Sequence, residues 1–348
     1  MMDGIINVYK EKGYTSHDVV AKMRGILRMK KIGHTGTLDP AAEGVLPVCL
    51  GKGTKLCDML TDKTKTYRAV MLLGQETDTQ DTTGQVLAQY PVTVTGEQVR
   101  EAVMGFLGPY MQVPPMYSAL KVNGKKLYEL ARAGKEVERQ ARPVEILDIQ
   151  VEAVDLPRVT MSVTCSKGTY IRTLCYDIGR KLGCGGCMES LLRTRVDRFC
   201  LEDALTLAQI EQLRDLGQVE QHVVPVDGVF ADLPKLRMNG AEGDKLVHNG
   251  NPFPTGQALY AAARAAADAA ETVAEVAADA VETVTGAAAD AAETVTEVAE
   301  AAAVGEADCP RFVRVRVYDS QDQFIGIYEY QEEKQRYKPQ KIFLGGSQ

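Results

Sequence analysis

The sequence predicts a mixed α/β (α+β) fold in two domains, residues 1–230 and residues 231–348. Strand-like and helix-like patterns interleave in the first part, which is typical of a mixed sheet flanked by helices. Short strand-like runs joined by Gly, Asn and Asp dominate the second part, which favours a small β-barrel. A low-complexity segment, residues 257–308, interrupts that second domain. The length suits about two domains of roughly 150 residues each.

In the first domain, three segments have strand patterns and three have helix patterns. Val19, Val20, Met23, Ile26 and Leu27 fall on one helical face, with Thr15 or Ser16 as the expected N-cap. Glycine closes each of the two later helices. The expected strands are KTYRAVMLLGQ, VEILDIQVEAV and RVTMSVTCS, and the expected helices are TSHDVVAKMRGILRMKK, TGEQVREAVMGFLG and TYIRTLCYDIGRKLG.

In the second domain, KLRMNGAEGDKLVHNGNPF and PRFVRVRVYDSQDQFIGIYEYQ are expected to form short strands separated by turns. The segment between them repeats every 11 residues, starting at Asp268, Asp279 and Asp290. Ala and Glu favour helix, but an apolar stripe of only Val and Ala leaves disorder as an alternative. Either a tolerated surface insertion or a protein-binding helix fits this pattern.

The net charge of −7 arises from that repeat segment. Residues 265–308 hold 11 acidic residues and no basic ones, and the rest of the chain has 40 basic against 36 acidic residues. The acidity therefore does not exclude a nucleic-acid partner. A basic cluster without intervening acidic residues fits either phosphate contacts or a solvated helix face; it consists of Lys22, Arg24, Arg28, Lys30 and Lys31.

Composition excludes several other classes of protein. Hydrophobic residues make up 45% and charged residues 25%, which excludes wholesale disorder and a collagen-like chain. No apolar run reaches the ~18 residues of a membrane helix, and no secretory signal is evident. Eight scattered cysteines without a framework favour a reducing cytoplasm. We therefore expect a cytoplasmic protein without a membrane partner.

The segment GHTGTLDPAAEGVLPVCLG, from Gly33, is the first candidate site. Glycines surround one carboxylate, Asp39, and Pro40 restricts its backbone to extended or turn geometry. Such a loop presents one side chain to a closely approaching ligand, although a structural Asx-turn fits equally well. Its glycine spacing does not match a phosphate-binding loop.

Two further segments suggest a partner for that carboxylate. In CSKGTYIRTLCYDIG, Arg172 falls in the first turn of a helix, where a cation opposes the helix dipole. An anionic partner is therefore expected, and Asp39 is the candidate, held by a two-point contact. Tyr67 in KTYR supplies a ring for stacking. VPPMYSALKVNGKKLYELARAG adds a Pro-Pro turn, two tyrosines and three lysines.

Cys184-Gly-Gly-Cys187 has the spacing of a metal or redox site. A single pair is a weak signal, and no second pair or His pair follows to complete four zinc ligands. We expect no metal there.

GHTGTLDP, KTYR, the TDTQDTTG loop, VPPMYSALKVNGKKLYELAR and CSKGTYIRTL together resemble the TruB family, the tRNA pseudouridine-55 synthases. The opening VYKEKGYTSHDVV also resembles that family's entry motif. The resemblance covers nearly all of residues 3–230. It implies a pseudouridine-synthase-type mixed sheet, with the C-terminal β segment similar to a PUA-like RNA-binding domain. The 11-residue repeat departs from the usual family pattern.

The resemblance implies isomerisation of a uridine within RNA, at position 55 in the T-loop of tRNA. Asp39 matches the nucleophilic aspartate, Arg172 its ion-pair partner, and Tyr67 the tyrosine that stacks on the flipped base and accepts the departing proton. Whether the carboxylate attacks the sugar or the base stays open. These side chains suffice for the chemistry, so no metal or organic cofactor is implied.

The substrate-binding residues are also implied by resemblance. His34 matches the histidine that fills the space left by flipped nucleotides, Asp81 a substrate-orienting position, and Leu191 an apolar residue lining the site. Residues expected to contact the T-stem-loop of tRNA are Lys30, Lys31, Lys121 and Tyr170. We expect a monomer, although the sequence itself does not fix the oligomeric state. A guide-RNA-dependent pseudouridine synthase and an RNA-folding chaperone are the alternative functions.

Overall fold

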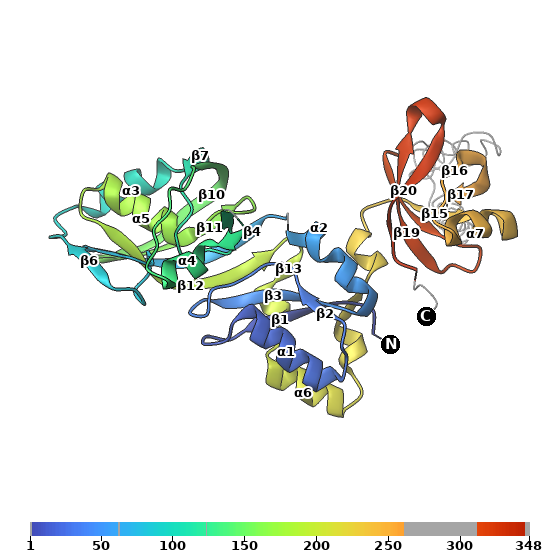
Figure 1. Cartoon of the computed structure of the whole chain (residues 1–348), viewed down its shortest axis with the longest axis horizontal. Coiled ribbons are helices and arrows are strands. Elements are labelled where there is room, and N and C mark those ends of the chain that lie inside the picture. Colours follow the sequence, from blue (N-terminus) through green and yellow to red (C-terminus); the bar gives the residue numbers. More distant parts are fainter. Residues whose placement is uncertain (1, 62, 123, 261–311, 345–348) are drawn as a thin grey trace, which may run out of the picture. The chain divides into compact units, whose positions relative to one another are not determined.

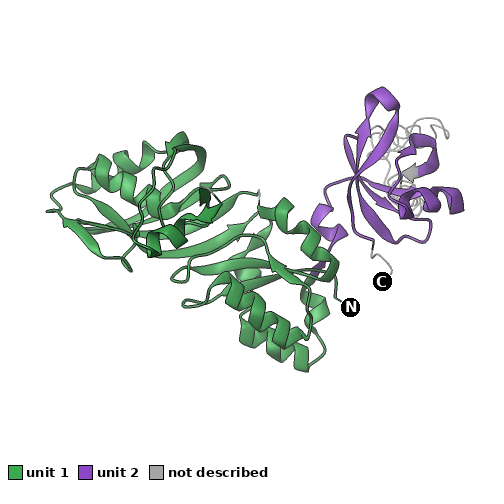
Figure 2. Cartoon of the chain, viewed as in Figure 1, with its two compact units in different colours: residues 1–223 green, residues 224–348 purple. Residues whose placement is uncertain are grey.

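The computed structural model describes residues 2–61, 63–122, 124–260 and 312–344. The chain forms two compact units, residues 1–223 and 224–348 (Figure 2). The sequence analysis places the domain boundary at residue 230. Asp227 accepts a hydrogen bond from the Tyr318 hydroxyl at 2.8 Å, and Phe230 contacts the ring of Phe343. Asp227 and Phe230 therefore pack within the second unit, whereas β14 (Val223–Pro225) pairs with β1 (Gly4–Lys10).

A large mixed sheet forms the first unit (Figure 1). From β1 to β7, neighbouring strands are antiparallel except for one parallel contact, between β3 and β12. Along the sheet the strands are β1 (Gly4–Lys10), β3 (Glu43–Leu50), β12 (Gly186–Val196), β4 (Lys65–Leu73), β11 (Arg158–Cys165), β10 (Arg142–Asp155) and β7 (Gly108–Gln112). Short strands β2 (Ile32–His34) and β13 (Phe199–Cys200) pair with β3 and β12.

Two hydrophobic cores cover different halves of this sheet. One lies between β1, β3 and two helices, α1 (Ser16–Leu27) and α6 (Leu207–Asp215). The other lies between β4, β11, β12 and two helices, α3 (Gly96–Met104) and α5 (Ile171–Lys181). The parallel contact of β3 with β12 joins the two halves. Smaller elements are α2 (Cys57–Thr61), α4 (Leu127–Arg132), β5 (Gln75–Thr77), β6 (Val86–Gln89), β8 (Lys121–Val122), β9 (Lys125–Lys126) and β14 (Val223–Pro225).

Helix α1 shows why the local sequence patterns were informative. Thr15 caps its first turn, and the side chain of Asp18 accepts a hydrogen bond from the Thr15 N–H at 2.8 Å. Val19, Val20 and Met23 are buried on the predicted face. The helix ends where Arg28 adopts a left-handed conformation, φ 51°.

The second unit contains a curled six-stranded sheet. Its strands follow the order β16 (Phe253–Pro254), β20 (Arg336–Ile342), β19 (Phe324–Gln331), β18 (Arg314–Tyr318), β15 (Lys235–Met238) and β17 (Ala258–Tyr260). Strand β17 pairs with β15. Residues 258–260, assigned from the sequence to the insertion, therefore belong to the sheet.

The sequence missed one helix of this unit. Residues 240–248 form α7 (Gly240–His248), where strands and turns were expected. Two glycines weaken helix propensity, so the local pattern favours turns. The helix packs closely instead: a Cβ at Gly243 would lie 3.0 Å from Cε of Met238, and Val247 is fully buried. Tertiary packing therefore overrides the local preference.

Within the described ranges, no helix combines the length and apolar character needed to cross a membrane. The 11-residue repeat lies outside the described residues, so the expectations of helix, disorder or a protein-binding role stay untested.

Candidate active site

Asp39 lies on the loop between β2 and β3, at the junction of the two halves of the sheet. Two contacts fix the loop backbone beside it. The N–H of Leu38 donates to Oγ of Ser16 at 2.9 Å, and the N–H of Gly13 donates to the carbonyl of Pro40 at 2.9 Å. The Asp39 side chain is 40% exposed. The loop therefore holds a carboxylate that a ligand can reach.

A buried lysine also holds this loop. Lys10 is inaccessible to solvent, and its Nζ donates to the carbonyls of Ala42 at 2.6 Å and Pro40 at 3.3 Å. Burial lowers the pKa of Lys10 to about 8, although the neighbouring carboxylates of Glu43 and Asp39 oppose this shift. The carbonyls of Pro40 and Ala42 thus accept hydrogen bonds from a buried ammonium group, and these bonds hold the loop that carries Asp39.

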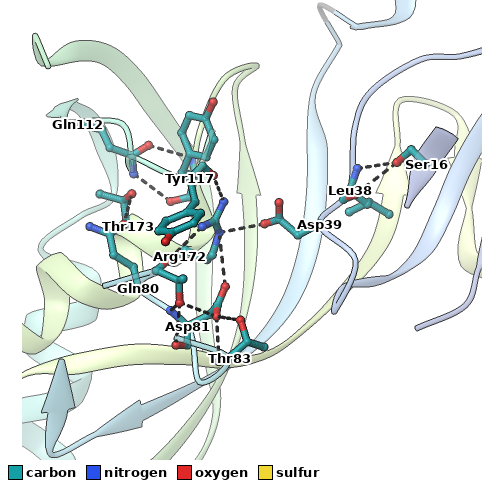
Figure 3. Close-up of polar contacts among 12 residues, drawn as sticks. Ser16, Leu38, Asp39, Gln80, Asp81, Thr83, Gln112, Tyr117, Arg172 and Thr173 are labelled. Atoms are coloured by element: carbon teal, nitrogen blue, oxygen red, sulfur yellow. Dashed lines mark hydrogen bonds and ion pairs between the residues drawn. The ribbon is translucent and has the colours of Figure 1, made fainter. Parts of the chain in front are cut away.

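Arg172, at the start of α5, meets Asp39 from the other half of the sheet (Figure 3). Its Nε lies 2.9 Å from Oδ2 of Asp39, and its side chain is only 5% exposed. Its other two nitrogens are already committed: Nη1 donates to the carbonyl of Thr79 at 2.9 Å and Nη2 to that of Tyr117 at 2.8 Å. The expected ion pair with Asp39 is present and is made through Nε, while the two Nη nitrogens bond backbone carbonyls.

Asp81 adds a second carboxylate to this arginine. Its Oδ2 lies 3.9 Å from Nε of Arg172, and its Oδ1 accepts hydrogen bonds from Thr79 at 2.8 Å and Thr83 at 2.9 Å (Figure 3). The loop itself is tied to β12, since Met188 donates its N–H to the carbonyl of Gln80 at 3.0 Å. Asp39, Arg172 and Asp81 therefore form one charged cluster.

Tyr67 and Leu191 form an apolar wall next to this cluster. Both are 8% exposed, on adjacent strands β4 and β12, and both pack in the same hydrophobic cluster as Leu38, the residue before Asp39. Burial raises the pKa of the Tyr67 hydroxyl, and Arg193 opposes that rise. Tyr67 and Leu191 therefore pack in the same apolar cluster as the residue that precedes Asp39.

His34 and Tyr170 lie on different elements near the site, His34 in β2 and Tyr170 at the start of α5. His34 ends β2 and meets His17 edge-to-face, with ring centroids 5.3 Å apart. Burial, followed by the charges of His17 and Arg193, lowers the pKa of His34 to about 4, so the ring is neutral at neutral pH. Tyr170 caps α5, and its N–H donates to Oε1 of Gln112 at 2.8 Å.

The three predicted lysines are not part of the charged cluster. Lys30 and Lys31 are exposed between α1 and β2, and Lys121 is exposed on the β8–β9 hairpin. No contact among the described residues joins any of them to Asp39. Their positions suit contacts with a ligand much larger than one base.

The sequence analysis missed several residues that build the site. Tyr117 and Thr79 act through backbone carbonyls, which no side-chain pattern reveals. Lys10 and Arg193 are buried cations, and a signal existed for Arg193, which follows Leu191 by two residues on the same strand face. Both hold carbonyls of the loop that carries Asp39.

Both cysteines of the Cys184-Gly-Gly-Cys187 pair are buried. Over the described part of the chain, no group of three or more His, Cys, Asp or Glu side chains is placed to hold a metal ion.

Comparisons with known proteins identify the family. The model for the TruB family pseudouridylate synthase N-terminal domain matches residues 24–171, and that for the tRNA pseudouridylate synthase B C-terminal domain matches residues 172–231. A tRNA pseudouridine synthase B from Lachnoclostridium phytofermentans is 48% identical over 99% of this chain and 100% of its own length. The chain belongs to the TruB family of pseudouridylate synthases. A tRNA pseudouridine synthase B from Alkaliphilus oremlandii is 51% identical over 72% of this chain and 82% of its own length.

Solved structures support the TruB fold. A chain of a Cbf5-Nop10-Gar1 complex superposes with a TM-score of 0.63 at 24% identity, covering 99% of this chain and 85% of the other. A chain of an H/ACA RNP bound to a substrate RNA gives the same TM-score at 21% identity, covering 99% and 86%. At these identities the comparison shows the shared fold only.

Proposed function

We propose that this TruB-family chain converts uridine 55 in the T-loop of tRNA to pseudouridine, with Asp39 as the nucleophile. One observation carries the proposal: an exposed carboxylate on a fixed loop faces a buried arginine whose other nitrogens are committed to backbone carbonyls. The names and length coverage of the relatives support tRNA as the substrate.

The reaction needs an extruded base, because the target atoms of a stacked uridine are inaccessible. Extrusion costs a few kcal/mol, which contacts to the RNA must supply. Lys30, Lys31 and Lys121 are exposed cations suited to phosphate contacts, and Tyr170 lies beside Arg172 for contact with the flipped nucleotide. Neutral His34 would occupy space left by the extruded bases without adding a charge.

Each central residue then has a defined task. Asp39 attacks the flipped nucleotide, and Arg172 holds the attacking carboxylate in place by an ion pair. Asp81 holds Arg172 from a second side. Tyr67 and Leu191 hold the uracil ring as it detaches and turns, and Tyr67 accepts the proton that leaves C5.

Incubation with an unmodified tRNA transcript tests this function directly. Mapping should find pseudouridine at position 55, and a transcript with cytidine at that position should remain unmodified. An unmodified position 55 after prolonged incubation, with the protein folded, would contradict the proposal.

A further inference from the structure

Arg193, on β12, is a buried arginine whose side chain contacts the loop that carries Asp39. It is 1% exposed and is one of the largest fully buried side chains. None of the described carboxylates lies within 4.0 Å of it. Burying an arginine without an anionic partner is costly unless its donors are satisfied in another way. Its partners therefore indicate what it does.

Two of those partners are the ends of the loop that carries Asp39. Nε of Arg193 donates to the carbonyl of Val45 at 2.7 Å, and Nη2 donates to the carbonyl of Gly36 at 3.3 Å. Gly36 precedes Asp39 on the loop, and Val45 follows it at the start of β3. One guanidinium thus fixes both flanks of the nucleophile's loop.

The third neighbour is Tyr67. Arg193 and Tyr67 lie directly opposite each other in the antiparallel β12–β4 pair. Both side chains are buried, and the positive charge of the guanidinium opposes the rise in the pKa of the Tyr67 hydroxyl. The same side chain therefore connects the tyrosine to the loop of Asp39.

The charges around Tyr67 come from three elements. Arg193 on β12 favours the ionised form, whereas Cys165 on β11 and Asp39 on the loop disfavour it, as burial does. Arg193 is the one positive group among these neighbours. Without it, burial, Cys165 and Asp39 would all favour the neutral hydroxyl of Tyr67.

We propose that Arg193 is a positioning residue that holds the Tyr67 oxygen toward the uracil and stabilises its anion during proton abstraction. This inference rests on the proposed function, because it concerns the tyrosine that accepts the C5 proton. When the ring reattaches through C5, the C5–H bond breaks and its proton passes to the ionised oxygen of Tyr67. The electron pair of that bond forms the C5–C6 double bond, and the electron pair of the C6–N1 double bond moves onto N1. Tyr67 later releases the proton to water, and N1 of the ring takes one from water.

Single-turnover rates at saturating enzyme, measured across pH, test this role. Arg193→Gln keeps a hydrogen-bond donor and loses the charge, so the rate near neutral pH should fall by about tenfold or more. The pH midpoint of the rising limb should move upward by about one unit. Arg193→Lys keeps the charge and should show a smaller loss and a smaller shift.

Two controls separate this role from a structural one. Arg195→Gln alters an exposed arginine on the same strand and should leave the midpoint in place. In a Tyr67→Phe background, Arg193→Gln should cause little further loss, because both changes remove the same interaction. An unmoved midpoint, or an equal loss in both backgrounds, would overturn the proposal.

A measurement without substrate separates the proposed role of Arg193 from the proposed modification of uridine 55. In protein labelled with carbon-13 at tyrosine Cζ, the resonance lost in Tyr67→Phe identifies Tyr67. Its ionisation should occur at higher pH in Arg193→Gln than in the unsubstituted chain. This shift is expected even if the chain failed to modify position 55, and an unchanged ionisation would contradict the role of Arg193 alone.

Discussion

At the scale of single residues, Arg172 is held by four groups at once. Backbone carbonyls of Thr79 and Tyr117 take two of its nitrogens, and the carboxylates of Asp39 and Asp81 share the third. Its position therefore does not depend on Asp39. The planar guanidinium is the feature that allows these contacts simultaneously, and a compact ammonium cannot reproduce it.

Arg172→Lys should lower the rate of pseudouridine formation by roughly a hundredfold, since the lysine cannot reach both carbonyls and the carboxylate. Single-turnover assays on a tRNA transcript measure the loss. Arg158→Lys is the matched control, because Arg158 pairs with Glu189 at an exposed site and should keep normal rates. Near-normal turnover by Arg172→Lys would show that one positive charge is sufficient there.

His34 makes the stability of the fold depend on pH. Its pKa is about 4 in the folded chain, below the ordinary value of 6.5, because burial disfavours the charged ring. The unfolded chain thus binds the proton more readily between these values. The contribution of His34 to the free energy of unfolding is complete above pH 6.5 and is lost as the pH falls toward 4.

His34→Gln should therefore make the free energy of unfolding less sensitive to pH between 6.5 and 4. Denaturant unfolding at a series of pH values measures this slope. His222, which is exposed, provides the control substitution, His222→Gln. An identical slope in His34→Gln and the unsubstituted chain would exclude His34 as the source.

At the scale of elements, the parallel contact between β3 and β12 brings the nucleophile's loop to the second core. Gly44 makes the contact possible, because its φ is +105° and a Cβ there would lie 2.2 Å from the carbonyl oxygen of Arg193. A larger residue would force the two strands apart. The geometry around Asp39 therefore depends on one glycine in β3.

Gly44→Ala should lower the free energy of unfolding by more than about 2 kcal/mol, from backbone strain and the clash combined. Gly25→Ala is the control, since Gly25 lies within α1 and a Cβ there would meet no atom within 4 Å. That change should raise stability by about 0.5–1 kcal/mol. Equal effects of the two substitutions in denaturant unfolding would contradict this account of the strand contact.

Elements with a strong period were predictable, and contacts made by tertiary packing were not. The capped, amphipathic helix α1 and the alternating strand β4 follow directly from their sequences. Helix α7 was missed because glycine weakens helix propensity, whereas Gly243 in this helix serves close packing against Met238 of β15. At the site, motifs pointed to Asp39 and Arg172, but the contact through Nε depends on carbonyls that lie 55 and 93 residues from Arg172 along the chain.

At the scale of the whole molecule, the second unit is built from segments on both sides of the 11-residue repeat. Strands β17 and β18 both flank β15, where Leu236 lies opposite Tyr260 on one side and Val317 on the other. Adjacent strands lie about 4.8 Å apart, so these two residues are separated by roughly 10 Å. The sheet therefore closes across a short span, whatever the length of chain between its strands.

Replacing residues 261–311 with a Gly-Ser linker of about eight residues, which spans up to about 28 Å, should preserve folding and turnover. Thermal unfolding and mapping on the tRNA transcript measure both. A linker of Ala and Glu residues with the same length should preserve folding and turnover to the same extent. If either variant failed to fold or lost most turnover, the repeat segment would be an integral part of the second domain.

The central claim is that Asp39 is the nucleophile, and Asp39→Asn tests it most directly. The amide keeps the shape of the side chain but cannot attack, and the carbonyls of Thr79 and Tyr117 still hold Arg172. We predict that this variant folds, binds the tRNA transcript within a few-fold of normal, and forms no pseudouridine at position 55. Substantial pseudouridine formation by Asp39→Asn would contradict the account.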